Sequence, residues 1–284
     1  MLKRILPITV ALLFDILPLQ AQDSSFHFKQ FDVPNSASTE ADGINARGEI
    51  VGFSFDRAGK QHGFSFSMGQ YIKLDFPGAS GTKTAGLNNR GDIVGTFTDA
   101  AGVQHGLVLE DGIFRQLDFP GSVSTQLGAI DDAREIVGFF ADTAGRTHGL
   151  VNASGTFTQI DVPGSTSTLI FGLNNHGDFV GAFVDASGKQ HGFLKSGNVF
   201  TTIDPPGSIS TFCFGINDRP STVGSFNDAA GRGHAFLDQH GAFTQLDFPD
   251  AVSTDGNGIN DEGTIVGDFF DAAGVEHGYV RIRR

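Results

Sequence analysis

The sequence predicts an all-β fold, a six-bladed β-propeller with four-stranded blades. Three observations lead to this fold class. Asp-x-Pro pairs recur at an unbroken spacing of 43 residues, turn residues divide each repeat into four short segments, and six repeats fill nearly the whole chain. Four antiparallel strands in a unit of about 40–50 residues are typical of a propeller blade.

The repeat keeps one register along the 284-residue chain, without an insertion or a deletion. A fixed period indicates that each repeat is one structural unit, which buries its apolar surface against its neighbours. The Asp residues of the Asp-x-Pro pairs are Asp32, Asp75, Asp118, Asp161, Asp204 and Asp247. A His returns with the same period at His62, His105, His148, His191, His234 and His277, and a Gly at Gly52, Gly95, Gly138, Gly181, Gly224 and Gly267.

The first repeat shows where the four strands lie. They are predicted over residues 38–45, 50–56, 61–66 and 71–75. Most turns between them pair Gly with Asn, Asp or Ser, which favour tight turns that need a positive φ. The link that follows contains Pro77. Proline cannot donate a hydrogen bond to a β-ladder, so this link is predicted to cross to the next blade.

The first and last repeats are incomplete in complementary ways. The chain starts with a fourth strand at residues 28–32 and ends with a third strand at residues 277–281. We therefore predict velcro closure, in which residues 26–32 pair antiparallel with residues 277–283 as the outer strand of the sixth blade. Closure covers an edge that would otherwise invite aggregation. An open solenoid is the alternative, but it needs polar capping repeats, and neither end resembles one.

Residues 1–21 resemble a secretory signal peptide. Lys3 and Arg4 precede a mostly apolar run, Pro18 ends that run, and Ala21 offers a small residue for cleavage, although Asp15 is atypical. The run is too short for a membrane span, which needs about 20 apolar residues. We expect a secreted or periplasmic protein whose mature part, residues 22–284, is the propeller and has no membrane attachment after cleavage.

Charge and cysteine content narrow the function classes. Removing residues 1–21 leaves 17 basic and 31 acidic residues, a formal net charge of −14. Such a surface repels the phosphates of nucleic acids and anionic membranes. The single Cys213 cannot form an internal disulfide, and its apolar neighbours indicate a buried, inert thiol.

The repeat resembles the HAF-repeat family of predicted bacterial extracellular proteins. The triplet His234-Ala235-Phe236 carries the family motif, and the other repeats read His-Gly-Phe, His-Gly-Leu or His-Gly-Tyr. Neighbouring Gly-Ile-Asn, Ile-Val-Gly and Asp-Ala-Ala-Gly elements also agree with the family. The resemblance covers essentially the whole mature chain. It implies export, but it implies little about activity and assigns no catalytic residues.

Each repeat also places an Asp six residues before its His, as in Asp56 and His62. Such a pair suggests a general base with its orienting group, or metal ligands. Six identical copies favour a structural role instead, in which the carboxylate caps a hairpin turn and bonds the imidazole. Calcium needs about 6–8 oxygen ligands, and each turn offers one carboxylate. We therefore expect no catalytic residues, no metal and no cofactor in these motifs.

Carbohydrate binding finds little support in the composition. The chain has no Trp and two Tyr, whereas sugar platforms favour exposed aromatic rings with a polar edge. Familiar motifs of hydrolases and phosphate-binding loops are absent from the sequence. The composition weakens the case for a glycan ligand but leaves it open.

The repeats differ most in the middle of the first strand, which should lie nearest the propeller axis. Polar candidates there come from the sixth, first and second repeats, and apolar candidates come from the fourth and fifth. They are Glu40, Asp42, Lys83 and Asp255 on the polar side, and Phe171, Phe212 and Phe214 on the apolar side. A pocket with an apolar wall and a few polar groups is typical of small-molecule sites. The alternative is that these residues pack between blades and merely vary.

These observations favour an exported binding or scaffold propeller, whose partner is an unknown small molecule, glycan or protein. The alternative is a secreted hydrolase or lyase with its site at the mouth of the central channel. A single off-repeat cluster of carboxylates that converge within hydrogen-bond reach would favour the enzyme, and an apolar, plugged channel would favour the scaffold.

One turn is predicted to break the repeat. Gly48, Gly91, Gly177 and Gly263 occupy a position that Pro220 takes in the fifth repeat and Arg134 in the third. Proline is fixed near a φ of about −65°. The turn at residues 217–220 should therefore differ from its glycine-bearing equivalents.

Overall fold

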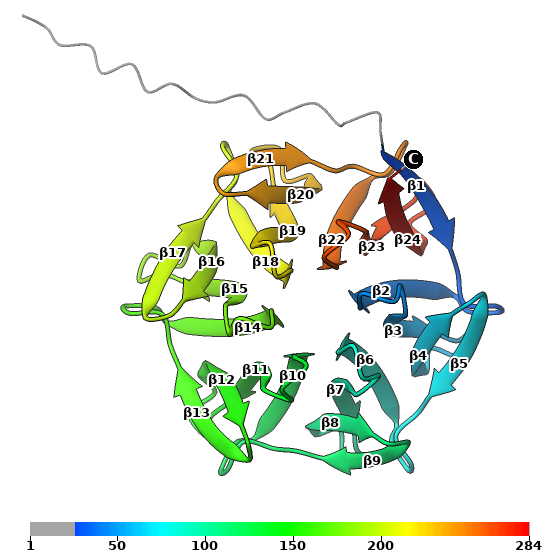
Figure 1. Cartoon of the computed structure of the whole chain (residues 1–284), viewed down its shortest axis with the longest axis vertical. Coiled ribbons are helices and arrows are strands. Elements are labelled where there is room, and N and C mark those ends of the chain that lie inside the picture. The colour runs from blue at the N-terminus through cyan, green and yellow to red at the C-terminus, as the bar shows by residue number, and fades with distance from the viewer. Residues whose placement is uncertain (1–25, 284) are drawn as a thin grey trace, which may run out of the picture.

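The computed structural model describes residues 26–283, which form six four-stranded antiparallel sheets arranged as a ring around a central axis (Figure 1). This is the predicted six-bladed propeller. The predicted signal peptide, residues 1–21, lies outside the described residues. Within the described part, no helix is long and apolar enough to cross a bilayer.

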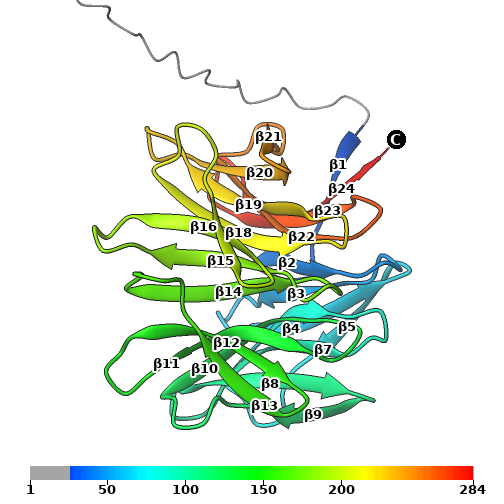
Figure 2. The same cartoon turned by 60° about the vertical axis from the view of Figure 1, so that its left-hand side comes forward.

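Each blade runs outward from the axis in chain order, and Figure 2 shows the blades as neighbouring twisted sheets. Blade 1 contains β2 (Ser38–Ile44), β3 (Ile50–Phe55), β4 (Gln61–Ser67) and β5 (Gln70–Leu74), each within one residue of its predicted bounds. Blade 2 contains β6 (Gly81–Leu87), β7 (Ile93–Thr98), β8 (Gln104–Glu110) and β9 (Ile113–Gln116). Blade 3 contains β10 (Ser124–Ile130), β11 (Ile136–Ala141), β12 (Thr147–Ala153) and β13 (Thr156–Ile160).

Blades 4 to 6 repeat this order. Blade 4 contains β14 (Ser167–Leu173), β15 (Phe179–Val184), β16 (Gln190–Ser196) and β17 (Val199–Ile203). Blade 5 contains β18 (Ser210–Ile216), β19 (Ser221–Asn227), β20 (Gly233–Gln239) and β21 (Ala242–Gln245). Blade 6 contains β22 (Ser253–Ile259), β23 (Ile265–Phe270) and β24 (Glu276–Arg283) from the end of the chain, and β1 (Phe26–Phe31) from its beginning.

The ring closes as predicted. β1 pairs antiparallel with β24, with Phe26 opposite Arg283 and Phe31 opposite Gly278 (Figure 1). The strand from the start of the chain therefore forms the outer edge of blade 6. Closure covers the edge of β24 and excludes the open solenoid.

The core consists of apolar clusters between neighbouring blades. In one cluster, Val94 of blade 2 packs against Leu127 and Leu150 of blade 3, and all three are almost fully buried. Cys213 is buried among apolar residues of blades 4 and 5, which agrees with its predicted environment. The blades are thus held by burial of apolar area, with no disulfide among the described residues.

A β-bulge interrupts the innermost strand of every blade. In blade 1, Ala41 pairs with Gly52 and Gly43 pairs with Val51, so Asp42 has no partner across the ladder. The recurrent glycine is needed opposite the bulge, because a Cβ on Gly52 would lie 2.0 Å from the carbonyl oxygen of Glu40. The unpaired residues of the six bulges are Asp42, Ala85, Gly128, Phe171, Phe214 and Asn257. The repeated glycines are visible in the sequence, but the bulges were not predicted.

The turn of blade 5 differs from its equivalents, as predicted. Gly91 has a φ of 87° and donates its N–H to the carbonyl of Asn88, whereas Pro220 is not among the residues with positive φ and has no N–H to donate. As a result, β19 begins at Ser221, one residue earlier than the other second strands. Arg134 adopts a φ of 66° in blade 3 and so preserves the usual turn.

The recurrent Asp and His form the predicted hairpin cap. Oδ1 of Asp56 accepts hydrogen bonds from the N–H groups of Ala58 and Lys60, and its Oδ2 lies 3.3 Å from Nε2 of His62. A second carboxylate was not foreseen. Nδ1 of His62 lies 2.9 Å from Oδ2 of Asp75, the Asp of the Asp-x-Pro pair. The imidazole therefore ties the hairpin of a blade to the start of the crossover.

Candidate functional site

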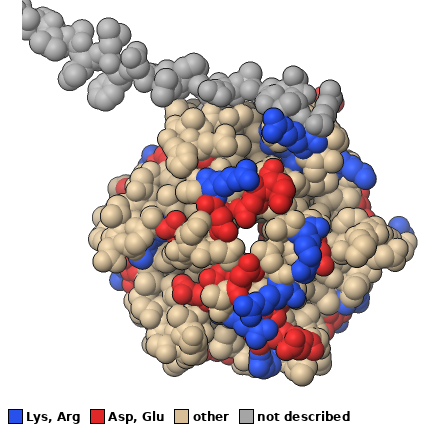
Figure 3. Space-filling model, in the orientation of Figure 1, with Lys and Arg blue, Asp and Glu red and all other residues tan. Residues whose placement is uncertain are grey.

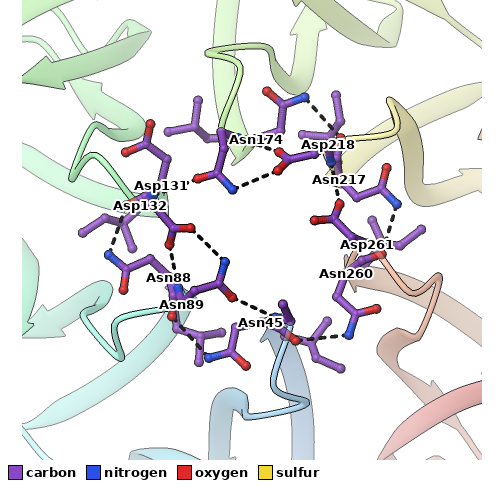
Figure 4. A pocket seen from close by; sticks show the side chains of 18 residues that line it. Asn45, Asn88, Asn89, Asp131, Asp132, Asn174, Asn217, Asp218, Asn260 and Asp261 are labelled. Carbon is purple, nitrogen blue, oxygen red and sulfur yellow. Dashed lines mark hydrogen bonds between the residues drawn. The ribbon is translucent and has the colours of Figure 1, made fainter.

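The two ends of the central channel are lined differently, and one end is nearly symmetrical. Charged side chains of both signs gather around the opening on the face seen in Figure 3. Figure 4 shows the polar ring at one end of the channel, in which each blade bonds the next. Nδ2 of Asn88 donates to the carbonyl of Asp131 at 3.0 Å, and the N–H of Asn89 donates to Oδ1 of Asp132 at 2.8 Å. Because such bonds join each blade to the next around the ring, we assign it to structure.

The other part of the channel is asymmetric and forms a cavity of about 190 Å³. The unpaired residue of all six bulges lines it, so the bulges place six variable positions around one space. Of the residues singled out by sequence, Glu40, Asp42, Lys83, Phe171, Phe214 and Asp255 line the cavity. Phe212 does not line the cavity but stacks on Phe214, with ring centroids 5.5 Å apart.

One wall of the cavity carries an ammonium between two carboxylates. Nζ of Lys83 lies 3.0 Å from Oδ1 of Asp42 and 3.3 Å from Oε1 of Glu40, and it sits 4.4 Å from the ring centroid of Phe53. Burial lowers the pKa of Lys83, but the charges and hydrogen bonds of Asp42 and Glu40 outweigh it, so the net pKa is raised. The ammonium therefore stays charged at neutral pH.

The neighbouring sector, from blade 6, is acidic. Asp255, Asp268 and Glu276 line it, and Asn257 donates a hydrogen bond of 2.9 Å to Oδ1 of Asp268. The ion pairs of Lys83 go to Glu40 and Asp42 of blade 1. Asn257 also donates to the carbonyl of Ala41 at 3.1 Å, which fixes the sector to blade 1.

Burial keeps protons on this acidic sector. Burial, followed by the negative charges of Glu40, Asp255 and Glu276, raises the pKa of Asp268 well above its usual range. The pKa of Glu276 rises to about 7, chiefly through burial and then through Glu40. Burial also raises the pKa of Asp255. The sector thus combines proton donors and acceptors near neutral pH.

The opposite wall is aromatic. Phe171 and Phe214 meet edge-to-face at 5.2 Å, and Phe139 meets Phe171 at 5.6 Å in the same manner. Leu127, from the same side of the ring, adds apolar surface to the lining. The lopsided distribution expected from the first strands is therefore present in one cavity.

The sequence reasoning missed Asp268 and Glu276, and it did not single out Asn257 from the polar first strand of the sixth repeat. Asp268 belongs to the second strand of its blade and Glu276 to the third, whereas only the first strands were compared. A signal existed at Asp268, because Phe53, Thr96, Phe139, Ala182 and Ser225 occupy its position in the other repeats. Asn257 is a bulge residue and departs from its equivalents in the same way.

Three carboxylates of the cavity lie close enough to share a ligand. Oxygen atoms of Glu40, Asp268 and Glu276 all lie within 4.8 Å of one another. Such a set can accept hydrogen bonds from hydroxyl or ammonium groups, or it can supply some of the oxygens that a hard cation needs. Because Lys83 already brings a positive charge to Glu40, hydrogen-bond donors suit the sector better than a metal ion does.

Comparisons with known proteins identify the fold. No family model matches the chain, and no curated protein matches its sequence. The solved structure of AofleA from Arthrobotrys oligospora aligns with a TM-score of 0.57 and 13% identity, over 90% of this chain and 86% of that one. A mutant of Aleuria aurantia lectin in complex with Fucα1-6GlcNAc aligns with a TM-score of 0.56 and 13% identity, over 89% and 93% of the two chains.

A sialidase has a similar fold as well. Trypanosoma rangeli sialidase aligns with a TM-score of 0.53 and 9% identity, over 89% of this chain and 57% of that one. The Aleuria aurantia lectin is itself described as a six-bladed β-propeller. At these identities the likeness establishes the fold alone: the chain is a six-bladed β-propeller similar in architecture to fucose-binding lectins.

Proposed function

We propose that this protein is an exported binding propeller that takes a small ligand in the asymmetric cavity of its central channel. One observation carries the proposal. The scaffold is repeated six times with a β-bulge in each blade, yet the bulge residues and their neighbours divide into a charged side and an aromatic side. Residues that only packed the ring together would have no reason to divide in this way.

The lining indicates a ligand with hydrogen-bond donors on one side and an apolar face on the other. Asp255, Asp268 and Glu276 accept bonds from hydroxyl or ammonium groups, while Phe171 and Phe214 offer ring surfaces for C–H groups. A monosaccharide unit of a glycan has both kinds of surface. The fold shared with fucose-specific lectins supports this class of ligand, although the chain lacks the Trp that such sites favour.

Export is part of the proposal. It is supported by the signal-like residues 1–21 and by the resemblance to the extracellular HAF-repeat proteins. Secretion in the native host, followed by determination of the mature N-terminus, tests this part separately.

A second candidate function is hydrolysis or elimination in the same cavity. The observation that favours it is a group of three carboxylates, Glu40, Asp268 and Glu276, whose oxygen atoms lie within 4.8 Å of one another. Glu276, with a pKa of about 7, retains a proton near neutral pH and can act as a general acid. A nearby ionised carboxylate would supply the base or nucleophile, as in glycoside hydrolases.

A thermal-shift screen with monosaccharides, short glycans and small amines tests the binding proposal. A ligand of the cavity should lose at least tenfold in affinity in both Asp268→Asn and Phe214→Leu. The control Glu262→Ala changes an exposed residue beside the polar ring and should leave affinity unchanged. Affinity that survives both cavity substitutions would place the site elsewhere.

Mass spectrometry of the same mixtures separates the two functions. A binding propeller returns each ligand intact. Turnover that disappears in Glu276→Gln, while binding persists, would establish the hydrolase or lyase instead.

A further inference from the structure

A second place where the repeat is broken lies in blade 1, away from the channel. In the other five blades, a phenylalanine of the second strand covers the ring of the recurrent histidine. The centroid distances are 5.1 Å for Phe97 and His105, 5.3 Å for Phe140 and His148, 5.1 Å for Phe183 and His191, 5.3 Å for Phe226 and His234, and 5.3 Å for Phe269 and His277. The histidine face is therefore a surface that this fold normally covers with an aromatic ring.

In three of those blades a second aromatic ring completes the stack. Phe76 of the crossover lies on Phe97 with ring centroids 3.7 Å apart and an interplanar angle of 3°. The pairs Phe119–Phe140 and Phe248–Phe269 repeat this geometry at 3.7 Å. Phe76 also meets Phe114 of the outer strand at 5.7 Å, edge-to-face. The space between crossover, second strand and outer strand is thus shaped for flat rings.

Blade 1 lacks both rings. Ser54 stands at the position of Phe97, and Val33 stands at the position of Phe76. The space that they leave is a cavity of about 450 Å³. Its lining includes Val33, Ser54, His62, Phe64 and Tyr71. Of these, Val33, Ser54 and Tyr71 are the equivalents of Phe76, Phe97 and Phe114, which pack against one another in blade 2. An apolar cavity of about 150 Å³ is already large enough for benzene.

We propose that this cavity of blade 1 is a second binding site, which takes a flat aromatic group of a small molecule. The ring would lie over the face of His62, where the other blades place their own phenylalanine. Tyr71, the equivalent of Phe114, would meet it edge-to-face. The hydroxyl of Ser54 and the ammonium of Lys73 at the rim offer polar contacts for a substituent.

The site is built to persist without its ligand. Nδ1 of His62 lies 2.9 Å from Oδ2 of Asp75, Nε2 lies 3.3 Å from Oδ2 of Asp56, and Lys73 pairs with Asp75 at 3.1 Å. The histidine is therefore held in the orientation that it has in the other blades. On the crossover side, Oγ of Ser36 donates to the carbonyl of Val33 at 2.7 Å and holds that wall in place.

Indole and phenol are suitable probes. Their binding to the whole mature chain can be followed by ligand-observed NMR. Saturable binding is expected, with intermolecular Overhauser contacts to the ring of Tyr71. A contact to a tyrosine ring can be assigned to Tyr71, because Tyr279, the other tyrosine of the chain, is fully buried and out of reach of the probe. No saturable binding, or contacts that do not include Tyr71, would overturn the proposal.

Substitutions that restore the missing rings provide the second test. Ser54→Phe should weaken indole binding at least tenfold, because it returns the ring that the other blades have. Val33→Phe fills the cavity from the crossover and serves if the first variant does not fold. Glu262→Ala, at an exposed position outside both cavities, is the control and should bind indole as the wild type does. Undiminished binding in either filled variant would place the aromatic site elsewhere.

Discussion

The two ends of the channel use the same six-fold scaffold for opposite purposes. At the polar ring, Asn88, Asn174, Asn217 and Asn260 occupy equivalent positions and make equivalent bonds to the next blade. In the asymmetric cavity, the equivalent positions hold residues as different as Asp42 and Phe171. The repeats share the residues that bond each blade to its neighbour, and they differ at the positions that face open space. Divergence inside a conserved geometry therefore marks the candidate site better than any single motif does.

The largest effect is expected where the common scaffold supports the divergent cavity. Gly181→Ala would place a Cβ 1.9 Å from the carbonyl oxygen of Leu169, opposite the bulge of Phe171. The strands would have to separate, so we expect a loss of about 3 kcal/mol or more in the free energy of unfolding. Chemical denaturation measures it. Gly256→Ala is the control, because the nearest atom would lie 3.4 Å away and blade 1 already has Ala41 there.

The next effect tests the repeated Asp–His–Asp contacts. His148 is 6% exposed and lies 2.9 Å from Asp161 and 3.3 Å from Asp142. His148→Ala leaves both carboxylates without that partner and should cost about 1–3 kcal/mol. His176→Ala, at an exposed turn, should have little effect in the same denaturation experiment. An unchanged stability of the His148 variant combined with a lost activity would make these residues functional.

A substitution that removes a carboxylate of the acidic sector should raise the free energy of unfolding rather than lower it, because this sector favours binding at the expense of stability. Asp268 and Glu276 hold protons more tightly when folded, so the folded state binds more protons and stability falls as pH rises from about 4.5 through the pKa of Glu276, about 7. Asp268→Asn should therefore raise the melting temperature at pH 8, by an amount equivalent to about 1–2 kcal/mol, and should weaken ligand binding. An equal change at pH 4 and pH 8 would contradict this account.

His105 adds a pH dependence of its own. Asp118 and Asp99 raise the pKa of His105 although burial lowers it, so this stabilisation is complete below about 6.5 and is lost as pH rises through the raised pKa. The hairpin carboxylates act at the other end of the scale. Hydrogen bonds from Ser187 and Lys189 lower the pKa of Asp185 to about 2, so that stabilisation is lost as pH falls below the ordinary value of about 3.9. Melting temperatures measured across pH should be highest at mildly acidic pH.

The smallest effect on stability is expected at the polar ring, where one hydrogen bond between neighbouring blades is missing. Five blades have an Asn or Asp that accepts the N–H of the preceding blade, but Ala46 offers no side-chain oxygen to Asp261. Ala46→Asn should supply that acceptor and add about 0.5–1 kcal/mol of stability. Ligand affinity at the asymmetric cavity should not change. A gain in stability that came with altered affinity would show that the two ends of the channel are coupled.

The sequence by itself determined the architecture. An uninterrupted period of 43 residues, turn residues at fixed offsets and the phases of the two ends were enough to predict six blades, their strands and the pairing of residues 26–32 with residues 277–283. The reason is that these properties depend on local chain chemistry repeated many times. Positive φ at Gly91 and its loss at Pro220 follow from a single residue and were equally predictable.

Only the tertiary structure decided which side chains meet. The bulge at Asp42, the second carboxylate at His62 and the approach of Asp268 and Glu276 to Glu40 involve different strands or blades. The empty space beside Ser54 is likewise defined by the crossover, the second strand and the outer strand together. Such contacts depend on how each sheet twists and how the blades rotate about the axis, and no local pattern records that geometry. The sequence could point to the variable positions, but the ring of blades had to close before they became a cavity.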